Sequence, residues 1–289
     1  MKPSYCSVIV PTFDRPEAVE ACVQALSHLD YPQDRLEIIL VDDGSRVPVR
    51  APLDREGVKI KVLRQHNAGP AAARNFGAQC ARGEILAFTD DDCAPKPQWL
   101  KELARVFRDH PIALVGGRTI NGLADNPYST ASQIIVDEAY RYFFEKNSNL
   151  RFFATNNMAI SAELFRESGG FDPSFRTSED RDFCDRWIRR GHPLVYVPEA
   201  VVDHRHDLTL TSFCRLHFRY GRGARRFHRV RAERSGDRIK PSLPYYAAVC
   251  QRMLFNPLSW NSLHMAGLVG LWQMSNVAGF LWQGRSQDL

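Results

Sequence analysis

Three consecutive aspartates, Asp90, Asp91 and Asp92, follow a short apolar run, Ile85–Phe88, after one threonine. The run has the length of a single buried strand. If the strand continued through the aspartates, its pleat would send Asp90 and Asp92 to one side and Asp91 to the other. Two carboxylates at the carboxyl end of such a strand suit Mg²⁺ or Mn²⁺ carrying a phosphate, because these ions prefer oxygen ligands. A solvated acidic turn is the alternative, and this stretch alone does not decide between the two.

Two further pairs of acidic residues lie at the end of a predicted strand and at the start of a predicted helix. Asp42 and Asp43 end a second apolar run, and Glu179 and Asp180 open a helix in which Thr177-x-x-Asp180 has the form of a capping box. The helix dipole favours a carboxylate anion there by ~0.3–1 kcal/mol. Asp180 is therefore expected to be deprotonated and able to accept a proton near pH 7. A turn residue at Asp43 and a simple helix cap at Asp180 are the alternatives.

Two histidines, His204 and His206, alternate on an extended segment that follows two valines. Imidazole can ligate Mn²⁺, so His204 is a candidate for a third metal ligand or a phosphate contact, and His206 is a weaker one. The alternative is a pair of polar side chains satisfied near the surface.

Strand and helix patterns alternate along the first half of the chain. The predicted strands are 7–12, 36–41, 58–63 and 85–88, and the predicted helices are 17–29, 71–81 and 99–109. This alternation is typical of a parallel sheet with helices on both faces. A strand over 113–119, a helix around 131–144 and a short strand over 194–197 are expected further on. The usual Gly-rich dinucleotide motif and the P-loop are absent from the sequence.

Composition describes an ordinary globular chain of 289 residues, with 44% hydrophobic and 25% charged residues. Its seven cysteines are an odd number without a C-x-x-C pair, which favours reduced thiols over disulfides or a zinc site. With no signal peptide recognised at the N-terminus, a cytoplasmic location is expected. The net charge of +5 is uneven, because nine arginines and one lysine against two acids give residues 215–240 a local +8.

Six motifs in the chain resemble those of the family 2 inverting glycosyltransferases, which have the GT-A fold, and point to the bacterial cell-surface-glycan type. The motifs are S-V-I-V-P-T-F-D-R, V-D-D-G-S, N-A-G-P-A-A-A-R-N, F-T-D-D-D-C, G-G-F-D and S-E-D-R-D-F-C. No single motif is decisive, but six in this order and spacing are specific, and they extend roughly over 7–206. The resemblance implies an α/β fold with a Rossmann-like, mostly parallel sheet and helices on both faces.

The resemblance also implies roles for individual residues. Asp180 matches the catalytic base, and Asp92 matches the direct metal ligand of the family's D-x-D, with Asp90 as its other acid. Mg²⁺ or Mn²⁺ would be the cofactor, and His204 is the candidate for a further ligand. The residues expected to bind the nucleotide sugar are Thr12, Asp14, Asp43, Arg74, Asp90 and Asp91. Those expected near the donor or acceptor sugar are Asn156, Asn157 and Glu179.

The implied reaction is inverting, metal-dependent transfer of one sugar from a nucleotide-diphosphate sugar to a hydroxyl. The acceptor would be a lipid-linked or cell-surface glycan precursor. Processive members carry Q-x-x-R-W well after the acidic pair, whereas here Arg186-Trp187 follows Asp180 within two turns and lacks the glutamine. We interpret this pair as helix packing and expect a single transfer per encounter. No nucleic-acid partner is predicted.

The predicted domains are a catalytic domain over 1–206 and a helical extension over 207–289. No charged residue occurs from Met253 to Gly284, a stretch long enough to span a bilayer but interrupted by polar residues. Together with the basic block it predicts peripheral attachment to the inner face of the cell membrane. Binding of an acceptor pyrophosphate by the arginines, or a helical hairpin packed on protein, are the alternatives.

Two other functions fit parts of the sequence. A D-x-D after an apolar strand also occurs in haloacid-dehalogenase-like phosphatases, in which the first Asp is a nucleophile. A sugar-nucleotide-binding protein with lapsed activity is the non-enzyme alternative, although Asp90, Asp92 and Asp180 are all present.

Overall fold

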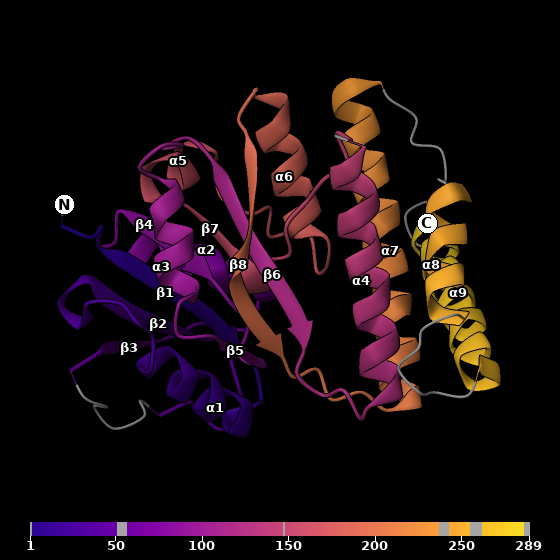
Figure 1. The fold of residues 1–289 in the computed structure, drawn as a ribbon, viewed down its shortest axis with the longest axis horizontal. Helices are drawn as coiled ribbons and strands as arrows, with labels where there is room; N and C mark the ends of the chain where they lie inside the picture. Colours follow the sequence, from indigo (N-terminus) through magenta and orange to yellow (C-terminus); the bar gives the residue numbers. More distant parts are fainter. Residues whose placement is uncertain (1, 51–56, 147, 237–242, 255–261, 286–289) are drawn as a thin grey trace. The chain divides into compact units, whose positions relative to one another are not determined.

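The computed structural model describes residues 2–50, 57–146, 148–236, 243–254 and 262–285. The chain forms two compact units (Figure 1). The first comprises Met1–Ile120 and Phe152–Arg205, and the second comprises Asn121–Arg151 and His206–Leu289. Residues 121–151, which the sequence places within a domain of 1–206, therefore belong by their contacts to the second unit. The functional division into a catalytic domain and an extension stays a prediction.

Half of the central sheet is parallel, as predicted. Its eight strands have the order β3-β2-β1-β4-β7-β6-β8-β5. Strand β1 pairs in parallel with β2 and β4, and β2 pairs in parallel with β3. The bounds of these strands are Cys6–Thr12 for β1, Leu36–Asp42 for β2, Lys59–Arg64 for β3 and Ile85–Phe88 for β4.

The other half of the sheet is antiparallel, which the alternation of elements did not predict. Strand β7 pairs antiparallel with β4 and β6, and β5 pairs antiparallel with β8. The bounds are Cys93–Pro95 for β5, Leu114–Asn121 for β6, Met158–Ser161 for β7 and Leu194–His204 for β8. A pattern of strands and helices records neighbours along the chain, but not the direction in which a later strand returns to the sheet. The sheet is therefore mixed, within an α/β fold.

Helices cover the sheet of the first unit through small and branched apolar side chains. Helix α1 buries four such residues, and α2 lies so close to the sheet that a Cβ added to Gly77 would be 2.6 Å from Ile9 Cγ2. This close approach explains the alanine-rich sequence of α2. The bounds are Pro16–Ser27 for α1, Pro70–Cys80 for α2, Trp99–Val106 for α3, Ala162–Glu167 for α5 and Glu179–Arg189 for α6. Two short 3₁₀ turns, η1 and η2, span Gln33–Arg35 and Thr155–Asn157.

The described part of the second unit is helical: α4 is Pro127–Glu145, α7 is Leu210–Ser235, α8 is Leu243–Leu254 and α9 is Ser262–Arg285. Asn126 caps α4 by accepting from the backbone of the first turn, and Thr209 with Ser212 forms a capping box on α7. The helices share a core that includes Phe213, Met265 and Trp272. Part of the uncharged stretch, 255–261, lies outside the described residues. Among the described residues, no helix is both long enough and apolar enough to cross a bilayer.

Two glycines let α7 and α9 pack backbone to backbone. A Cβ added to Gly279 would lie 1.9 Å from the Phe218 carbonyl oxygen, and one added to Gly221 would lie 1.9 Å from the Asn276 carbonyl oxygen. Both obstacles are backbone atoms, which cannot move aside as a flexible side chain can. Neither glycine can therefore be enlarged without separating the two helices.

We expect Gly279→Ala to lower the free energy of unfolding of the second unit by about 1–3 kcal/mol, because the added methyl group must push the helices apart. Gly270→Ala is the matched control, since a Cβ at Gly270 on the same helix meets no neighbouring atom within 4 Å. The control should be neutral or stabilising by ~0.5–1 kcal/mol. Urea denaturation followed by circular dichroism measures both changes, and equal effects would contradict the close helix crossing.

Candidate functional site

The parallel strands β1, β2 and β4 end at one edge of the sheet and carry the predicted polar residues there. Thr12 at the end of β1 pairs with Asp42 at the end of β2. Asp43 is buried, and its carboxylate accepts from the backbone N–H groups of Ala68 at 2.9 Å and Gly69 at 2.8 Å. It also accepts from Gln65 Nε2 at 2.7 Å. Asp43 thus holds the loop that leads into α2, and its predicted contact with a nucleotide base stays a prediction.

The three aspartates lie beyond β4, in a turn between β4 and β5, so the strand pleat does not orient them as predicted. Asp91 accepts a hydrogen bond from Thr12 Oγ1 at 2.7 Å. Asp90 instead pairs with Arg74, whose Nη2 lies 2.5 Å from Asp90 Oδ1. Because a turn reverses direction within a few residues, Asp90 and Asp91 meet different partners. We call Asp90–Asp92 the acidic turn.

Arg15 is a site residue that sequence reasoning missed. Its Nη1 lies 3.1 Å from Asp91 Oδ1 and 2.9 Å from Asp92 Oδ2, so one nitrogen bridges the two carboxylates. Half of its side chain is exposed, at 51%. Burial nevertheless raises the pKa of Asp91 to about 6, against the lowering effect of Arg15. The available signal was its place three residues after Thr12, in the loop that follows β1 at the same sheet edge.

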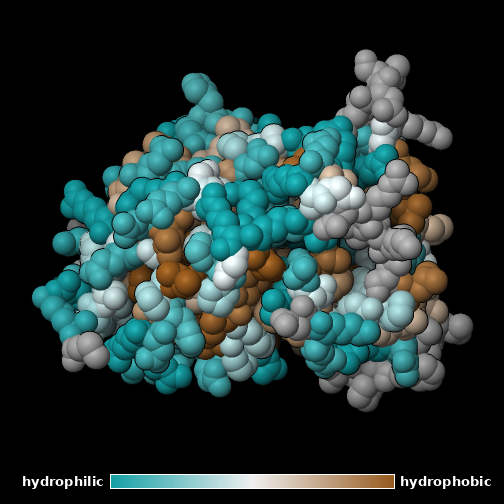
Figure 2. Space-filling view, turned by 90° about the horizontal axis from the view of Figure 1, so that it is seen from above, coloured by the Kyte–Doolittle hydropathy of each residue, from teal (hydrophilic) through white to brown (hydrophobic). Residues whose placement is uncertain are grey.

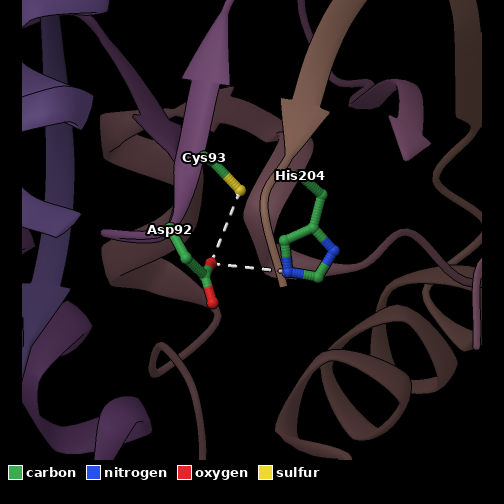
Figure 3. A group of neighbouring side chains, drawn as sticks. All are labelled: Asp92, Cys93 and His204. Carbon is green, nitrogen blue, oxygen red and sulfur yellow. Dashed lines mark hydrogen bonds and ion pairs between the residues drawn. The ribbon is translucent and has the colours of Figure 1, made fainter. Parts of the chain in front are cut away.

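Asp92 meets His204 and Cys93 on its other side (Figure 3). Strands β5 and β8 place Cys93 opposite His204. Asp92 Oδ1 lies 3.4 Å from His204 Nε2 and 3.9 Å from Cys93 Sγ. Among the described residues, the possible ligand atoms of Asp92, Cys93 and His204 all lie within 4.8 Å of one another. Asp90 does not belong to this group. The predicted pair of Asp92 and His204 is therefore brought together.

Asp92, Cys93 and His204 differ in protonation before any cation is bound. Burial raises the pKa of Cys93 well above its usual range, and the neighbouring aspartates add to this, so the thiol is protonated in the absence of a cation. Burial works against the charged form of His204, but its hydrogen bond to Asp92 and the charges of Asp92 and Asp90 raise its pKa overall. The Asp92 carboxylate offers the oxygen ligand that Mg²⁺ and Mn²⁺ prefer, whereas His204 would have to lose its proton before it could ligate Mn²⁺.

Arg74 connects the acidic turn to the start of α6. Its Nη2 pairs with Asp90 and its Nη1 donates to Glu179 Oε1 at 2.8 Å. The Arg74 side chain is only 4% exposed. A buried guanidinium requires such partners, because an unpaired buried charge is strongly destabilising. The two carboxylates in turn keep their positions through Arg74, so α2 sets the distance between the acidic turn and α6.

Asp180 lies in the first turn of α6, but the predicted capping box is wrong. The N-cap is Ser178, one residue after Thr177, and its side chain makes no cap hydrogen bond. Ser178 has a φ of 70°, and Asp14 has a φ of 55°. They are the two non-glycine residues with positive φ in the described ranges. Left-handed backbone at such residues costs about 1–3 kcal/mol and is typical of functional sites.

The environment of Asp180 reverses the expectation based on the helix dipole. Burial, followed by the negative charge of Glu179, raises the pKa of Asp180 to about 7. One carboxylate oxygen accepts from the Arg181 N–H at 2.8 Å. The removal of water therefore outweighs the dipole. A carboxylate with a pKa near 7 can still accept a proton close to neutral pH.

The remaining predicted residues have mainly structural contacts. Asn157 is 1% exposed, accepts from Trp99 Nε1 at 2.8 Å, and donates to the Ala200 and Arg118 carbonyls. Its predicted contact with a sugar stays a prediction. Asn156 is buried beside it and accepts from Thr119. The Asp14 carboxylate forms an ion pair with Arg46. His206 belongs to the second unit.

The helix packing expected for Arg186-Trp187 agrees with their contacts. Trp187 is 1% exposed, within the aromatic core of the first unit. Arg186 pairs with Asp182 at 3.0 Å and donates to the carbonyl groups of Ser168 and Gly170. Both side chains are thus committed to holding α6 in place.

Comparison with known proteins gives consistent matches. The sequence model of glycosyl transferase family 2 matches residues 7–169. A pre-mycofactocin glycosyltransferase of Mycobacterium tuberculosis is 31% identical over 225 residues, which cover 75% of this chain and 46% of that protein. Glycosyltransferase AglE of Haloferax volcanii is 24% identical over 229 residues, covering 76% of this chain and 72% of AglE. The chain thus spans about half the length of the first of these relatives.

The fold also matches a solved structure. Mannosyltransferase PcManGT from Pyrobaculum calidifontis, in complex with GDP-Man and Mn²⁺, has a TM-score of 0.67 and 17% sequence identity. The match covers 97% of this chain and 88% of that one. At this identity the likeness establishes the GT-A fold.

Proposed function

This chain belongs to glycosyl transferase family 2 and is a glycosyltransferase, and we propose that it transfers one sugar with inversion from a nucleotide-diphosphate sugar to an acceptor hydroxyl. The observation that supports this best is the Arg74 bridge. Arg74 joins Asp90 of the acidic turn to Glu179, the residue directly before Asp180. Asp90, a proposed donor-binding residue, is therefore connected through Arg74 and Glu179 to Asp180, the proposed proton acceptor.

Asp180 is the proposed general base. As the acceptor oxygen attacks the anomeric carbon, its proton passes to a carboxylate oxygen of Asp180, and the bond from that carbon to the diphosphate oxygen breaks. The nucleoside diphosphate leaves with the bonding electron pair. The raised pKa of Asp180 supports this role, because a base is most effective when its pKa lies near the working pH.

Asp92 and His204 are the proposed ligands of a divalent cation, Mg²⁺ or Mn²⁺. Their ligand atoms already face each other at 3.4 Å, and PcManGT was solved with Mn²⁺. When bound, the cation would neutralise charge on the departing diphosphate. Asp92 orients its other oxygen towards Arg15, so its two oxygens serve different partners.

Arg15 is then the counter-ion of the acidic turn before the cation arrives. Three adjacent carboxylates repel each other, and Arg15 pairs with two of them. A cation that binds Asp92 is repelled by the guanidinium but attracted by the carboxylates. Arg15 should therefore weaken binding of the free cation, while its exposed donors are available to an anionic phosphate group.

We expect Arg15→Gln to tighten Mn²⁺ binding to the donor-free protein by about three- to tenfold, because one nearby positive charge is lost. Asp92→Asn should abolish this binding. Titration of Mn²⁺ followed by electron paramagnetic resonance measures both. Arg105→Gln is the matched control, since this side chain is 65% exposed and pairs with Glu102 on α3. If Arg15→Gln weakened Mn²⁺ binding, the residue would be a support for the site and not its counter-ion.

The proposed donor is a nucleotide-diphosphate sugar, and the proposed acceptor is a lipid-linked or cell-surface glycan precursor. We propose action at the cytoplasmic face of the cell membrane. The engagement of Arg186 and Trp187 in packing supports one transfer per encounter.

The family assignment does not favour a haloacid-dehalogenase-like phosphatase. The presence of Asp90, Asp92 and Asp180 argues against a lapsed enzyme.

Asp180→Asn should retain the affinity for the donor nucleotide and lower the transfer rate by ~10²–10⁴-fold, because the general base is lost. A thermal-shift screen of nucleoside diphosphates with Mn²⁺ identifies the nucleotide, and calorimetry measures its affinity. The wild-type rate should rise as pH increases through about 7, as Asp180 loses its proton. Glu163→Gln, an exposed carboxylate on α5, is the control. Near-normal turnover of Asp180→Asn at saturating substrate would place the base elsewhere.

A further inference from the structure

Helix α9 has an exposed apolar side. Met274, Val277, Leu281 and Trp282 are 63%, 51%, 60% and 60% exposed. Their spacing places them along one side of the helix, because residues three, four and seven apart are neighbours on a helical surface. The sequence of α9 before Arg285 contains no charged residue. Figure 2 shows hydrophobic side chains open at the surface of the C-terminal helices.

The other side of α9 is fully engaged, so the exposed side is not a helix that failed to pack. Met265, Leu268 and Trp272 are each at most 3% exposed, in the core of the second unit. Gly279 is pressed against the backbone of α7. The orientation of α9 is therefore fixed, and the exposed residues cannot turn inward without breaking this packing.

Arginines of α7 lie beside the C-terminal half of this apolar side. Arg222 Nε donates to Gln283 Oε1 at 2.8 Å, and the Arg225 guanidinium lies 5.2 Å from the ring centre of Phe280. Phe218, one turn before Arg222 on the same face of α7, has its ring centre 6.5 Å from that of Trp282. Positive charge is thus held next to exposed apolar surface by specific contacts.

We propose that the exposed side of α9, together with Arg222 and Arg225, is a docking surface for an anionic lipid bilayer. Apolar side chains would enter the boundary between headgroups and acyl chains, and the arginines would contact lipid phosphates. Trp282 suits this boundary, where amphipathic rings are enriched. The helix lies in the plane of the surface and does not cross the bilayer. This inference concerns a surface only and does not depend on the proposed chemistry.

Charge favours a bilayer over a second copy of the chain. A symmetric dimer through α9 would bring two copies of the same positively charged surface into one interface. Like charges that meet in an interface are unfavourable. Anionic lipid supplies the opposite charge and the apolar layer at once, so it complements both parts of the surface.

Vesicle flotation of the full chain tests the proposal. The probes are vesicles of phosphatidylcholine with phosphatidylglycerol, and vesicles of phosphatidylcholine alone. We expect binding to the anionic vesicles at low salt and partial release at high salt. Met274→Gln with Leu281→Gln should weaken partitioning by about tenfold or more, because apolar insertion is lost. Arg222→Gln with Arg225→Gln should weaken it by about tenfold or more at low salt.

Two controls separate surface effects from damage to the fold. Ile112→Gln with Val47→Gln replaces exposed apolar residues of the first unit, and Lys101→Gln with Arg105→Gln removes two exposed charges from α3. Both control pairs should bind vesicles as the wild type does. In addition, anionic vesicles should shift tryptophan emission of the wild type to the blue, and Trp282→Phe should lose this shift. The emission shift reports the environment of Trp282 and not the stability of the fold.

The proposal is overturned if the full chain ignores anionic vesicles at low salt, or if the α9 pair and its control pair bind equally. It is also overturned if Met274→Gln with Leu281→Gln converts a dimer into a monomer in sedimentation without changing vesicle binding. In that case the surface is an interface between copies of the chain. Failure of glycosyl transfer would leave every one of these measurements intact.

Discussion

The site depends on the neutralisation of carboxylates gathered at one edge of a sheet. The acidic turn and the start of α6 contribute acids that would repel each other, and two guanidinium groups offset them. Arg74 is buried and pairs with Asp90 and Glu179, so it acts as a fixed part of the architecture. Arg15 is half exposed and pairs with Asp91 and Asp92, so it is the replaceable one. The difference in burial separates a structural counter-ion from one that a ligand can displace.

The surroundings of Asp180 disfavour its charged form. Burial and the charge of Glu179 raise its pKa, although Arg181 and Arg74 work in the opposite direction. The charged form of Asp180 is thus costly to the fold at neutral pH. The left-handed backbone of Ser178 just before α6 is a second local cost. Both features destabilise the fold locally, as is common at sites where activity and stability conflict.

Much of the fold could be predicted from the sequence, because each parallel strand and its helix have a clear hydrophobic period, and the motifs identify the family. The orientation of Asp90–Asp92 could not, since it depends on where β4 ends, and a strand that ends before the acids leaves their directions to their partners. The pairing of Arg15 was not predictable for a related reason: it requires the loop after β1 to meet the acidic turn in space. The antiparallel strands and the membership of 121–151 in the second unit are likewise set by tertiary contacts.

The central claim is a single displacement in which Asp180 takes the proton of the acceptor while the diphosphate departs from the opposite side of the sugar. Such a reaction inverts the anomeric centre, and the stereochemistry can be read directly from the product. Once the donor has been identified, proton nuclear magnetic resonance of the first product gives the configuration of the new glycosidic bond. The account predicts the configuration opposite to that of the donor. A product with the configuration of the donor would contradict it, because retention requires a different sequence of bond changes.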